Sequence, residues 1–443
     1  MGSNAFFIIR LILLLILFFQ YPFSLLIGFP FPWWTYALGG GIFFLSCILS
    51  CFRGLPRKRL SALDFGIEQL RLCLVSLPVG FLFSGLFVIF YQPFDWGILL
   101  TQAAIFFGYE AFVFLLGVST VYIFSLQLGV KWRLIGILGA WVPILNLCIL
   151  AKLISICTRE VRFECDRELL EQTREESRLC ATKYPILLVH GLLFRDWKLI
   201  NYWGRIPAAL KRNGATVYYG NQQSATSIAK SGIELSRRII EICETTGCEK
   251  VNIIAHSKGG LDARYAITHT EAGKYVASLT TVSSPHRGVG FAVPTLKRIP
   301  HAIQNWIGNR YNSALMLLGD TAPDLMLAIR AMTVPACKKF NRETPDRPGV
   351  LYMSVGSKLQ HPLSAQFPLN LSAILVRHFD GASDGMVPVS SMKWGSLFII
   401  PECRSFRGIS HGDMIDLNRS NLKGFNVREF YVWLVKYLKD AGL

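Results

Sequence analysis

Ser257 is the residue of this chain whose setting most clearly predicts chemistry. Residues 251–260 read Val-Asn-Ile-Ile-Ala-His-Ser-Lys-Gly-Gly, so the serine has Ala255 and Gly259 two positions away on either side. A buried strand that turns sharply into a helix needs small residues at both places, because the turn presses them against neighbouring backbone. The A-x-S-x-G pattern therefore predicts a nucleophilic serine, although a serine that opens a helix is also an ordinary N-cap.

Such a serine needs a histidine to take its proton and a carboxylate to orient that histidine. In a strand–turn–helix setting the acid and the histidine follow the serine in that order. His411 lies in a loop ahead of a predicted C-terminal helix and is the expected base. Asp384 and Asp380 compete for the role of the acid. We prefer Asp384, because an apolar segment follows it at once, and keep Asp380 as the alternative.

The developing oxyanion requires preorganised backbone N–H donors. Lys258, directly after the serine, is expected to supply one of them. The second is expected from Leu192, in the loop that follows an apolar run at 185–189. His190 precedes the serine along the chain, so a structural role in shaping this loop is expected for it.

The surrounding elements alternate between short apolar runs and helical patterns. This alternation predicts an α/β fold, with a mostly parallel sheet and helices on both faces. An insertion at about 289–335 carries amphipathic helices, which suit either a cap over the site or ordinary core packing. Strands are expected at 185–189, 215–219, 251–255, 278–283, 350–355, 372–376 and 396–400, and helices at 203–212, 226–246 and 427–439.

The first 156 residues have the composition of a membrane protein. Five apolar stretches reach the length of about 20 residues that a helix needs to cross a bilayer, and four or six spans remain possible. A polar helical connector is expected at 157–183, and the α/β domain at 184–443. The expected spans are 5–29, 33–52, 70–91, 97–128 and 134–156.

The formal charge of the chain is +17, from 46 Lys and Arg against 29 Asp and Glu. The positive charge forms no nucleic-acid-binding stripe, and attraction to an anionic membrane surface is its simpler use. The loop at 53–59 is positive, which predicts a cytoplasmic N-terminus and, after five spans, an extracytoplasmic α/β domain. Lys152 and Arg159, after the last span, favour the opposite side. The eleven cysteines show no zinc-ligand spacing.

Taken together, several segments resemble the bacterial true lipases, triacylglycerol lipases of the α/β-hydrolase superfamily. The resemblance implies that Ser257 is the nucleophile, Asp384 the acid and His411 the base, with Leu192 and Lys258 as oxyanion donors. The matching segments run in the family's order and are 184–191, 252–265, 283–288, 340–341, 349–354, 383–387 and 411–413.

The family also often binds a structural calcium through two aspartates near the catalytic histidine. Asp413 matches one of them. The other is expected some twenty residues ahead of the acid, and no aspartate occurs between Pro348 and Phe379. We therefore expect no required cofactor, and calcium remains an open alternative.

The sequence predicts a multi-pass membrane protein whose α/β-hydrolase domain cleaves carboxylic esters, with lipid acyl esters as substrates. The membrane and the lipid ester are the expected partners, and the oligomeric state is left open. Transfer of the acyl group to an acceptor other than water uses the same residues and is an alternative. A membrane sensor or transporter with a hydrolase-like, non-catalytic binding module is the alternative from a different class of protein.

Overall fold

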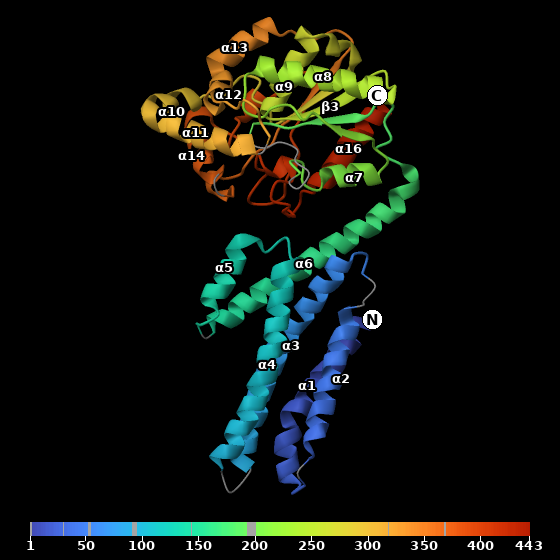
Figure 1. Ribbon diagram of the computed structural model, residues 1–443, viewed down its shortest axis with the longest axis vertical. Helices are drawn as coiled ribbons and strands as arrows, with labels where there is room; N and C mark the ends of the chain where they lie inside the picture. The colour runs from blue at the N-terminus through green and yellow to red at the C-terminus, as the bar shows by residue number, and fades with distance from the viewer. Residues whose placement is uncertain are drawn as a thin grey trace. The chain divides into compact units, whose positions relative to one another are not determined.

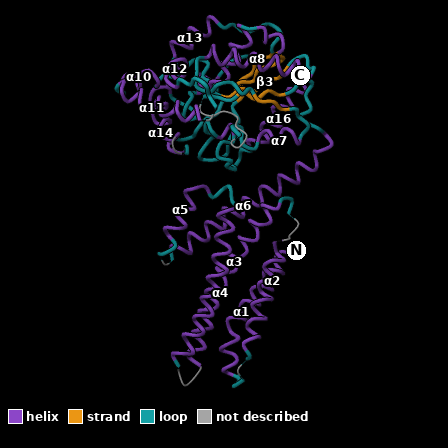
Figure 2. Tube along the Cα trace, in the orientation of Figure 1, coloured by secondary structure: helices purple, strands orange, loops and turns teal. Residues whose placement is uncertain are grey.

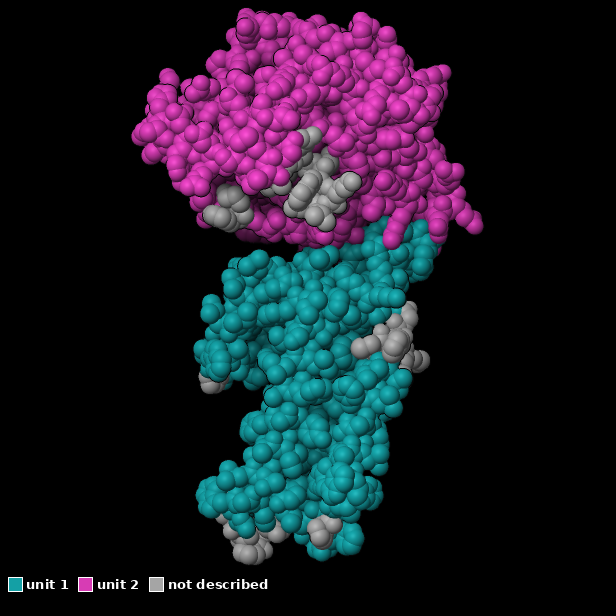
Figure 3. Space-filling view, viewed as in Figure 1, with its two compact units in different colours: residues 1–172 teal, residues 173–443 magenta. Residues whose placement is uncertain are grey.

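The computed structural model describes residues 2–29, 31–51, 55–90, 95–142, 144–192, 201–317, 319–366 and 369–443. The chain divides into two compact units, residues 1–172 and 173–443 (Figure 3). Each unit has hydrophobic clusters of its own. The first unit is helical, and the second contains the sheet.

Three helices of the first unit are long and apolar enough to cross a membrane, over Phe7–Leu26, Lys58–Phe90 and Trp96–Phe124. A shorter apolar helix covers Trp33–Leu49. The helices of this part of the chain are α1 (Gly2–Leu26), α2 (Trp33–Cys51), α3 (Lys58–Phe90), α4 (Trp96–Phe124), α5 (Gly129–Gly139) and α6 (Leu145–Arg174) (Figure 1).

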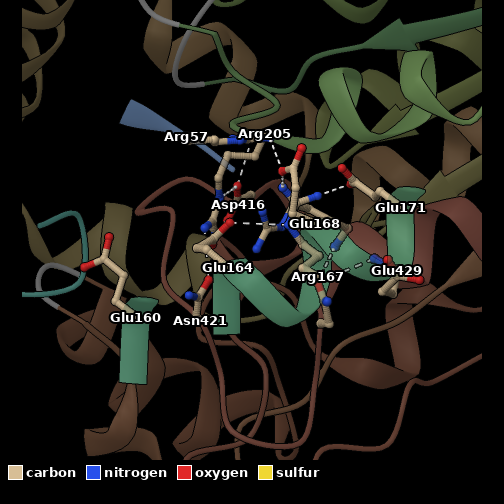
Figure 4. Close-up of polar contacts among 12 residues, drawn as sticks. Arg57, Glu160, Glu164, Arg167, Glu168, Glu171, Arg205, Asp416, Asn421 and Glu429 are labelled. Atoms are coloured by element: carbon tan, nitrogen blue, oxygen red, sulfur yellow. Dashed lines mark hydrogen bonds and ion pairs between the residues drawn. The ribbon is translucent and has the colours of Figure 1, made fainter. Parts of the chain in front are cut away.

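The fifth expected span, 134–156, is not one helix. Its first half belongs to α5, which ends at Gly139, and its second half begins α6 at Leu145. Pro143 stands between the two helices in the sequence, and proline has no backbone N–H and clashes with the preceding turn of a helix. Helix α6 then continues through most of the expected polar connector. Its Arg167 pairs there with Glu164 and Glu171, one helical turn to either side (Figure 4).

Polar side chains within the membrane unit are paired across helices. Ser76 on α3 donates a hydrogen bond to the Glu110 carboxylate on α4, and Arg10 on α1 pairs with Glu68 on α3. A hydrogen bond between neighbouring helices satisfies a carboxylate in an apolar environment. The hydrogen bond from Ser76 gives Glu110 a structural explanation.

The second unit contains a parallel sheet, whose strands are orange in Figure 2. Its six strands lie in the order β2-β1-β3-β4-β5-β6. From β1 the chain moves to β2 at one edge of the sheet, and from β3 to β6 it moves towards the opposite edge. Because parallel crossovers are right-handed, this change of direction places helices on both faces of the sheet. The strands are β1 (Ile186–Val189), β2 (Val217–Tyr219), β3 (Val251–His256), β4 (Val276–Val282), β5 (Leu351–Val355) and β6 (Leu397–Ile399).

Alternate side chains of β1 point to opposite faces, and each face has its own cluster. Ile186 and Leu188 pack with α7 (Ile206–Arg212) and α16 (Val427–Asp440). Leu187 and Val189 pack with residues of α8 (Ile228–Thr246), and α9 (Lys258–His269) covers the same face. Because both faces are covered, every residue of β1, β3 and β4 is buried.

The insertion between β4 and β5 folds into helices, several of which expose large apolar side chains. Trp306 is 61% exposed and Leu317 85% exposed, whereas Leu315 is buried against Leu192. The remaining helices of the unit are α10 (Ala292–Arg298), α11 (His301–Leu317), α12 (Leu325–Ala331), α13 (Val334–Glu343), α14 (Leu369–Asp380) and α15 (Val389–Met392), with 3-10 turns at Glu175–Ser177, Glu271–Tyr275, Pro362–Ser364 and Asp413–Ile415.

One expected strand is wrong. Residues 372–376 lie inside the helix α14 and not in the sheet. Ala373 and Val376, three positions apart, are buried, while Leu371 and Ile374 are exposed. That spacing belongs to one face of a helix, and a short apolar run does not distinguish a strand from a helix by itself.

Candidate active site

Ser257 occupies a strained turn between β3 and α9. Its backbone has φ 55° and ψ −130°, a conformation that residues other than glycine rarely adopt. A Cβ atom on Gly259 would lie 2.3 Å from the carbonyl oxygen of His190. The small residue expected at that position is therefore required by the close approach of the loop after β1. Ala255 is fully buried and fits without conflict.

Asp384 and His411 are in direct contact. His411 Nδ1 lies 2.7 Å from Asp384 Oδ2, and the two residues also share a backbone hydrogen bond of 2.9 Å. The other carboxylate oxygen accepts hydrogen bonds from the backbone of Met386 and Val387, at 3.0 and 2.8 Å. Ser357 Oγ donates to Oδ2 at 3.2 Å. The carboxylate is fully buried and fixed on all sides, so it can hold the imidazole in one orientation.

Asp380, the alternative acid, is engaged elsewhere. Its carboxylate accepts hydrogen bonds from the backbone N–H groups of Gly290 and Phe291, at 2.9 and 3.0 Å. These residues precede α10, so Asp380 fastens the start of the insertion. This contact gives Asp380 a structural explanation and leaves Asp384 as the carboxylate beside His411.

His256 connects the serine turn with the histidine loop. The ring centroids of His256 and His411 are 4.4 Å apart, and Ser257 is the next residue in the chain. The Oη atom of Tyr202 lies 2.7 Å from His256 Nδ1. Burial, together with the nearby His411, holds the pKa of His256 well below its ordinary value. A neutral His256 adds no positive charge beside the expected base. Its contact with His411 could not be read from the sequence.

The loop after β1 lies against the serine. A Cβ atom on Gly191 would come within 2.9 Å of Ser257 Cβ. Leu192 follows at once, and its side chain is buried against Leu315 of α11 and Leu325 of α12. The ring nitrogens of His190 each lie 2.9 Å from a backbone carbonyl oxygen. These contacts suit the expected role of His190 in shaping the loop. The rest of the loop, from residue 193, lies outside the described residues.

Lys258 begins α9, and the first N–H groups of a helix have no partner within it. The side chain of Lys258 is fully buried, where its Nζ lies 2.8 and 3.0 Å from the carboxylate oxygens of Asp262 and 3.0 Å from Ser231 Oγ. This buried ion pair fastens the first turn of α9 to α8. Nothing in the residue pattern around Ser257 predicts it.

A calcium ion does not fit at Asp413. Both carboxylate oxygens accept hydrogen bonds from Arg407 Nη2, at 3.0 and 2.9 Å. Oδ2 also accepts from the backbone N–H and the hydroxyl of Ser410. Both oxygens of Asp413 are therefore engaged by groups of this chain. Within the described ranges, no group of three or more His, Cys, Asp or Glu side chains could hold a metal ion.

A second arginine anchors the other end of the histidine loop. Arg205 donates to Asp416 through its backbone N–H, at 2.9 Å, and through Nε and Nη2, both at 2.7 Å (Figure 4). Asp416 adopts a positive φ of 55°. His411 is thus followed by two aspartates, Asp413 and Asp416, that are each held by an arginine, Arg407 and Arg205 respectively.

A model of the family described as palmitoyl protein thioesterase matches residues 185–317. A triacylglycerol lipase of Pseudomonas fragi is 30% identical over 297 residues, which cover 59% of this chain and 98% of the relative. Triacylglycerol lipases of Pseudarthrobacter phenanthrenivorans and Burkholderia plantarii are each 34% identical over 177 residues, or 37% of this chain. The chain spans 55% and 49% of their respective lengths, about half of each.

Among solved structures, the chain is similar to the lipase of Staphylococcus hyicus, with a TM-score of 0.46 and 18% identity over 58% of this chain and 96% of that one. It is also similar to a mature lipase of Bacillus licheniformis, with a TM-score of 0.43 and 19% identity over 57% and 92% of the two chains. The match to the Pseudomonas fragi enzyme covers nearly all of that relative. The parallel sheet and the serine turn of this chain are consistent with that match. The chain belongs to the triacylglycerol lipase family of α/β hydrolases.

Proposed function

We propose that this protein is a membrane-anchored serine hydrolase that cleaves carboxylic esters, with lipid acyl esters as its substrates. The observation that carries the proposal is the buried Asp384–His411 pair beside the strained turn of Ser257. An oriented imidazole close to a serine hydroxyl is the arrangement that activates a serine.

In the proposed reaction, Ser257 Oγ attacks the ester carbonyl carbon while His411 takes the hydroxyl proton. The negative charge on the carbonyl oxygen is stabilised by the N–H groups of Leu192 and Lys258. The imidazolium then gives its proton to the leaving alcohol, and the acyl group stays on Ser257. Water, deprotonated by His411, attacks the acyl-enzyme and releases the carboxylic acid. Asp384 orients the imidazole and stabilises its charged form throughout.

Two features support lipids as the substrate class. The helices of the insertion expose large apolar side chains, such as Trp306 and Leu317, next to elements that contact the oxyanion loop. An exposed apolar surface of this kind suits contact with a lipid phase. Three relatives at 30–34% identity are named triacylglycerol lipases. The apolar helices of the first unit would keep the enzyme at the membrane.

Contacts within the first unit support a cytoplasmic hydrolase domain. Arg59, at the start of α3, donates to the carbonyl of Phe124, at the end of α4, and to Glu160 of α6. The chain beyond α4 therefore returns to the end of the bundle that carries the positive loop, without the fifth crossing over 134–156. Positive loops stay in the cytoplasm. This inference replaces the extracytoplasmic location that five spans predicted.

The direct test of the enzyme is Ser257→Ala in the full chain, purified in detergent and assayed on a nitrophenyl butyrate ester. Loss of the nucleophile should lower kcat/KM by about 10⁴-fold or more. Ser313→Ala, on the exposed face of α11, is a matched control that should keep full activity. Labelling with a fluorophosphonate should modify Ser257, as located by mass spectrometry. Equal activity of Ser257→Ala and the wild type, or an adduct at another residue, would refute the proposal.

Acyl transfer uses the same serine and differs in the group that attacks the acyl-enzyme. Addition of an alcohol acceptor during turnover should divert acyl groups to a new ester if transfer dominates. Because the palmitoyl protein thioesterase model matches residues 185–317, a palmitoyl thioester belongs in the same assay. If the protein is a non-catalytic sensor or transporter, none of these substrates will turn over.

A further inference from the structure

Arg407 bonds to two segments that approach the Asp384–His411 pair from different sides. Its Nη2 lies 3.0 and 2.9 Å from the two oxygens of Asp413, and its Nε lies 3.1 Å from the carbonyl oxygen of Ser364. The hydroxyl of Ser364 donates back to the carbonyl of Arg407 at 2.7 Å. The arginine side chain is 20% exposed and that of Asp413 5% exposed, so this contact is largely shielded from water.

The two segments are those that hold the acid and the base. Asp413 lies two residues after His411, and its Oδ2 accepts from the backbone N–H of Ser410 at 2.8 Å. Ser364 lies twenty residues ahead of Asp384, just before α14 leads into the turn of the acid. The resemblance to the lipases implies calcium-binding aspartates at about these two positions, of which this chain has only Asp413.

We propose that the Arg407 guanidinium replaces the structural calcium and acts as the positioning residue for His411. The charges support this exchange. Two aspartates balance one divalent cation, and a single aspartate balances one guanidinium, so the site is neutral in both cases. A guanidinium also donates in several directions at once. It can therefore tie a carboxylate to a carbonyl, as a metal ion does.

This inference rests on the proposed hydrolase function, and ester hydrolysis by the full chain in detergent tests it. Excess EDTA should leave wild-type activity unchanged, and added CaCl2 should not raise it. Arg407→Ala should lower kcat about 10- to 100-fold with KM changed less than about twofold, because the imidazole is misplaced while substrate binding is intact. Arg404→Ala removes an exposed arginine three residues away and should be neutral.

A rescue experiment separates positioning from general loss of structure. Ser364→Asp combined with Arg407→Ala creates two carboxylates at the two places, and its activity should return in millimolar CaCl2 and disappear again in EDTA. Arg407→Ala alone should gain nothing from CaCl2.

Three results would overturn the inference: full kcat in Arg407→Ala, loss of wild-type activity in EDTA, or a folded double variant that ignores CaCl2. Absence of any Ser257-dependent activity in the wild type would instead refute the proposed function.

Discussion

At the scale of single residues, the buried Lys258–Asp262 pair is the least expected feature of the site. Burial raises the pKa of Asp262 to about 6, against the opposing effect of Lys258. Desolvation thus outweighs the attraction of the partner, as is common for buried ion pairs. Such a pair contributes little net stability, yet the loss of one partner leaves an unbalanced charge in the interior.

We therefore expect Asp262→Asn to lower the free energy of unfolding by about 3–5 kcal/mol. The double variant Lys258→Met with Asp262→Asn should recover most of that loss, because both charges are then removed. Thermal unfolding followed by tryptophan fluorescence measures both effects. If Asp262→Asn is as stable as the wild type, Lys258 is not left as an unpaired buried charge and the argument is wrong.

The same carboxyl group predicts a pH dependence of stability. Its pKa in the folded protein, about 6, lies above the ordinary value of 3.8 for an aspartate. The folded state therefore binds the proton more tightly, and the contribution of Asp262 to stability is complete below about pH 3.8 and falls as the pH rises towards 6. Titration of the unfolding midpoint should show this component in the wild type and lack it in the double variant. An identical pH slope in both proteins would contradict it.

At the scale of elements, the approach of the loop after β1 to the turn after β3 determines the shape of the site. The carbonyl of His190 passes so close to Gly259 that a methyl group has no room. The parallel pairing of β1 with β3 imposes this approach, because it aligns the ends of both strands. The serine and the oxyanion loop are therefore placed by the sheet and not by their own contacts alone.

Gly259→Ala should accordingly reduce kcat by at least about 100-fold, because a displacement of about 1 Å in a catalytic loop has an effect of that size. Gly308→Ala is the matched control. Gly308 lies within α11, where a Cβ atom makes ordinary contacts of 3.5 Å and longer. Alanine there should keep full activity and add up to about 1 kcal/mol of stability. Ester hydrolysis and thermal unfolding report the two effects. Equal activity of Gly259→Ala and Gly308→Ala would show that the loop after β1 moves to accommodate the added methyl group at no cost to catalysis.

At the scale of the whole molecule, the proposed path of the chain through the membrane determines which lipids the enzyme would meet. Glu160 of α6 accepts from Arg59, from Ser125 Oγ at 2.6 Å and from the N–H of Leu126 at 3.1 Å. These contacts join α6 to the end of the α3–α4 hairpin that carries positive charge. The proposed cytoplasmic location therefore predicts lipids of the inner leaflet as substrates.

In a bacterial host, green fluorescent protein fused after Leu443 should fluoresce, and alkaline phosphatase at the same place should be inactive. Fusions after Pro32, between α1 and α2, should give the reverse pattern, because that loop has no lysine or arginine and is expected on the extracytoplasmic side. Active phosphatase after Leu443 would show that the hydrolase domain lies on the extracytoplasmic side.

The sequence by itself determined the class of fold and predicted the serine turn. Continuous apolar runs that alternate with helical patterns specify a parallel sheet covered on both faces, and the α/β class is confirmed. The pattern around Ser257 is local, because small residues are required within two positions of the serine. The roles of Ser257, Asp384 and His411 remain predictions until the variants are assayed.

Only the tertiary structure decided features that depend on residues far apart in the chain. It placed Asp384 rather than Asp380 beside His411, showed a helix at 369–380, and joined Arg407 to Asp413 and Ser364. Local spacing cannot predict these outcomes. Asp380 and Asp384 have similar sequence surroundings, and only the folded chain shows that Asp384 contacts His411 while Asp380 binds Gly290 and Phe291. Burial and long-range hydrogen bonds distinguish the two aspartates, and these interactions form only when the chain folds.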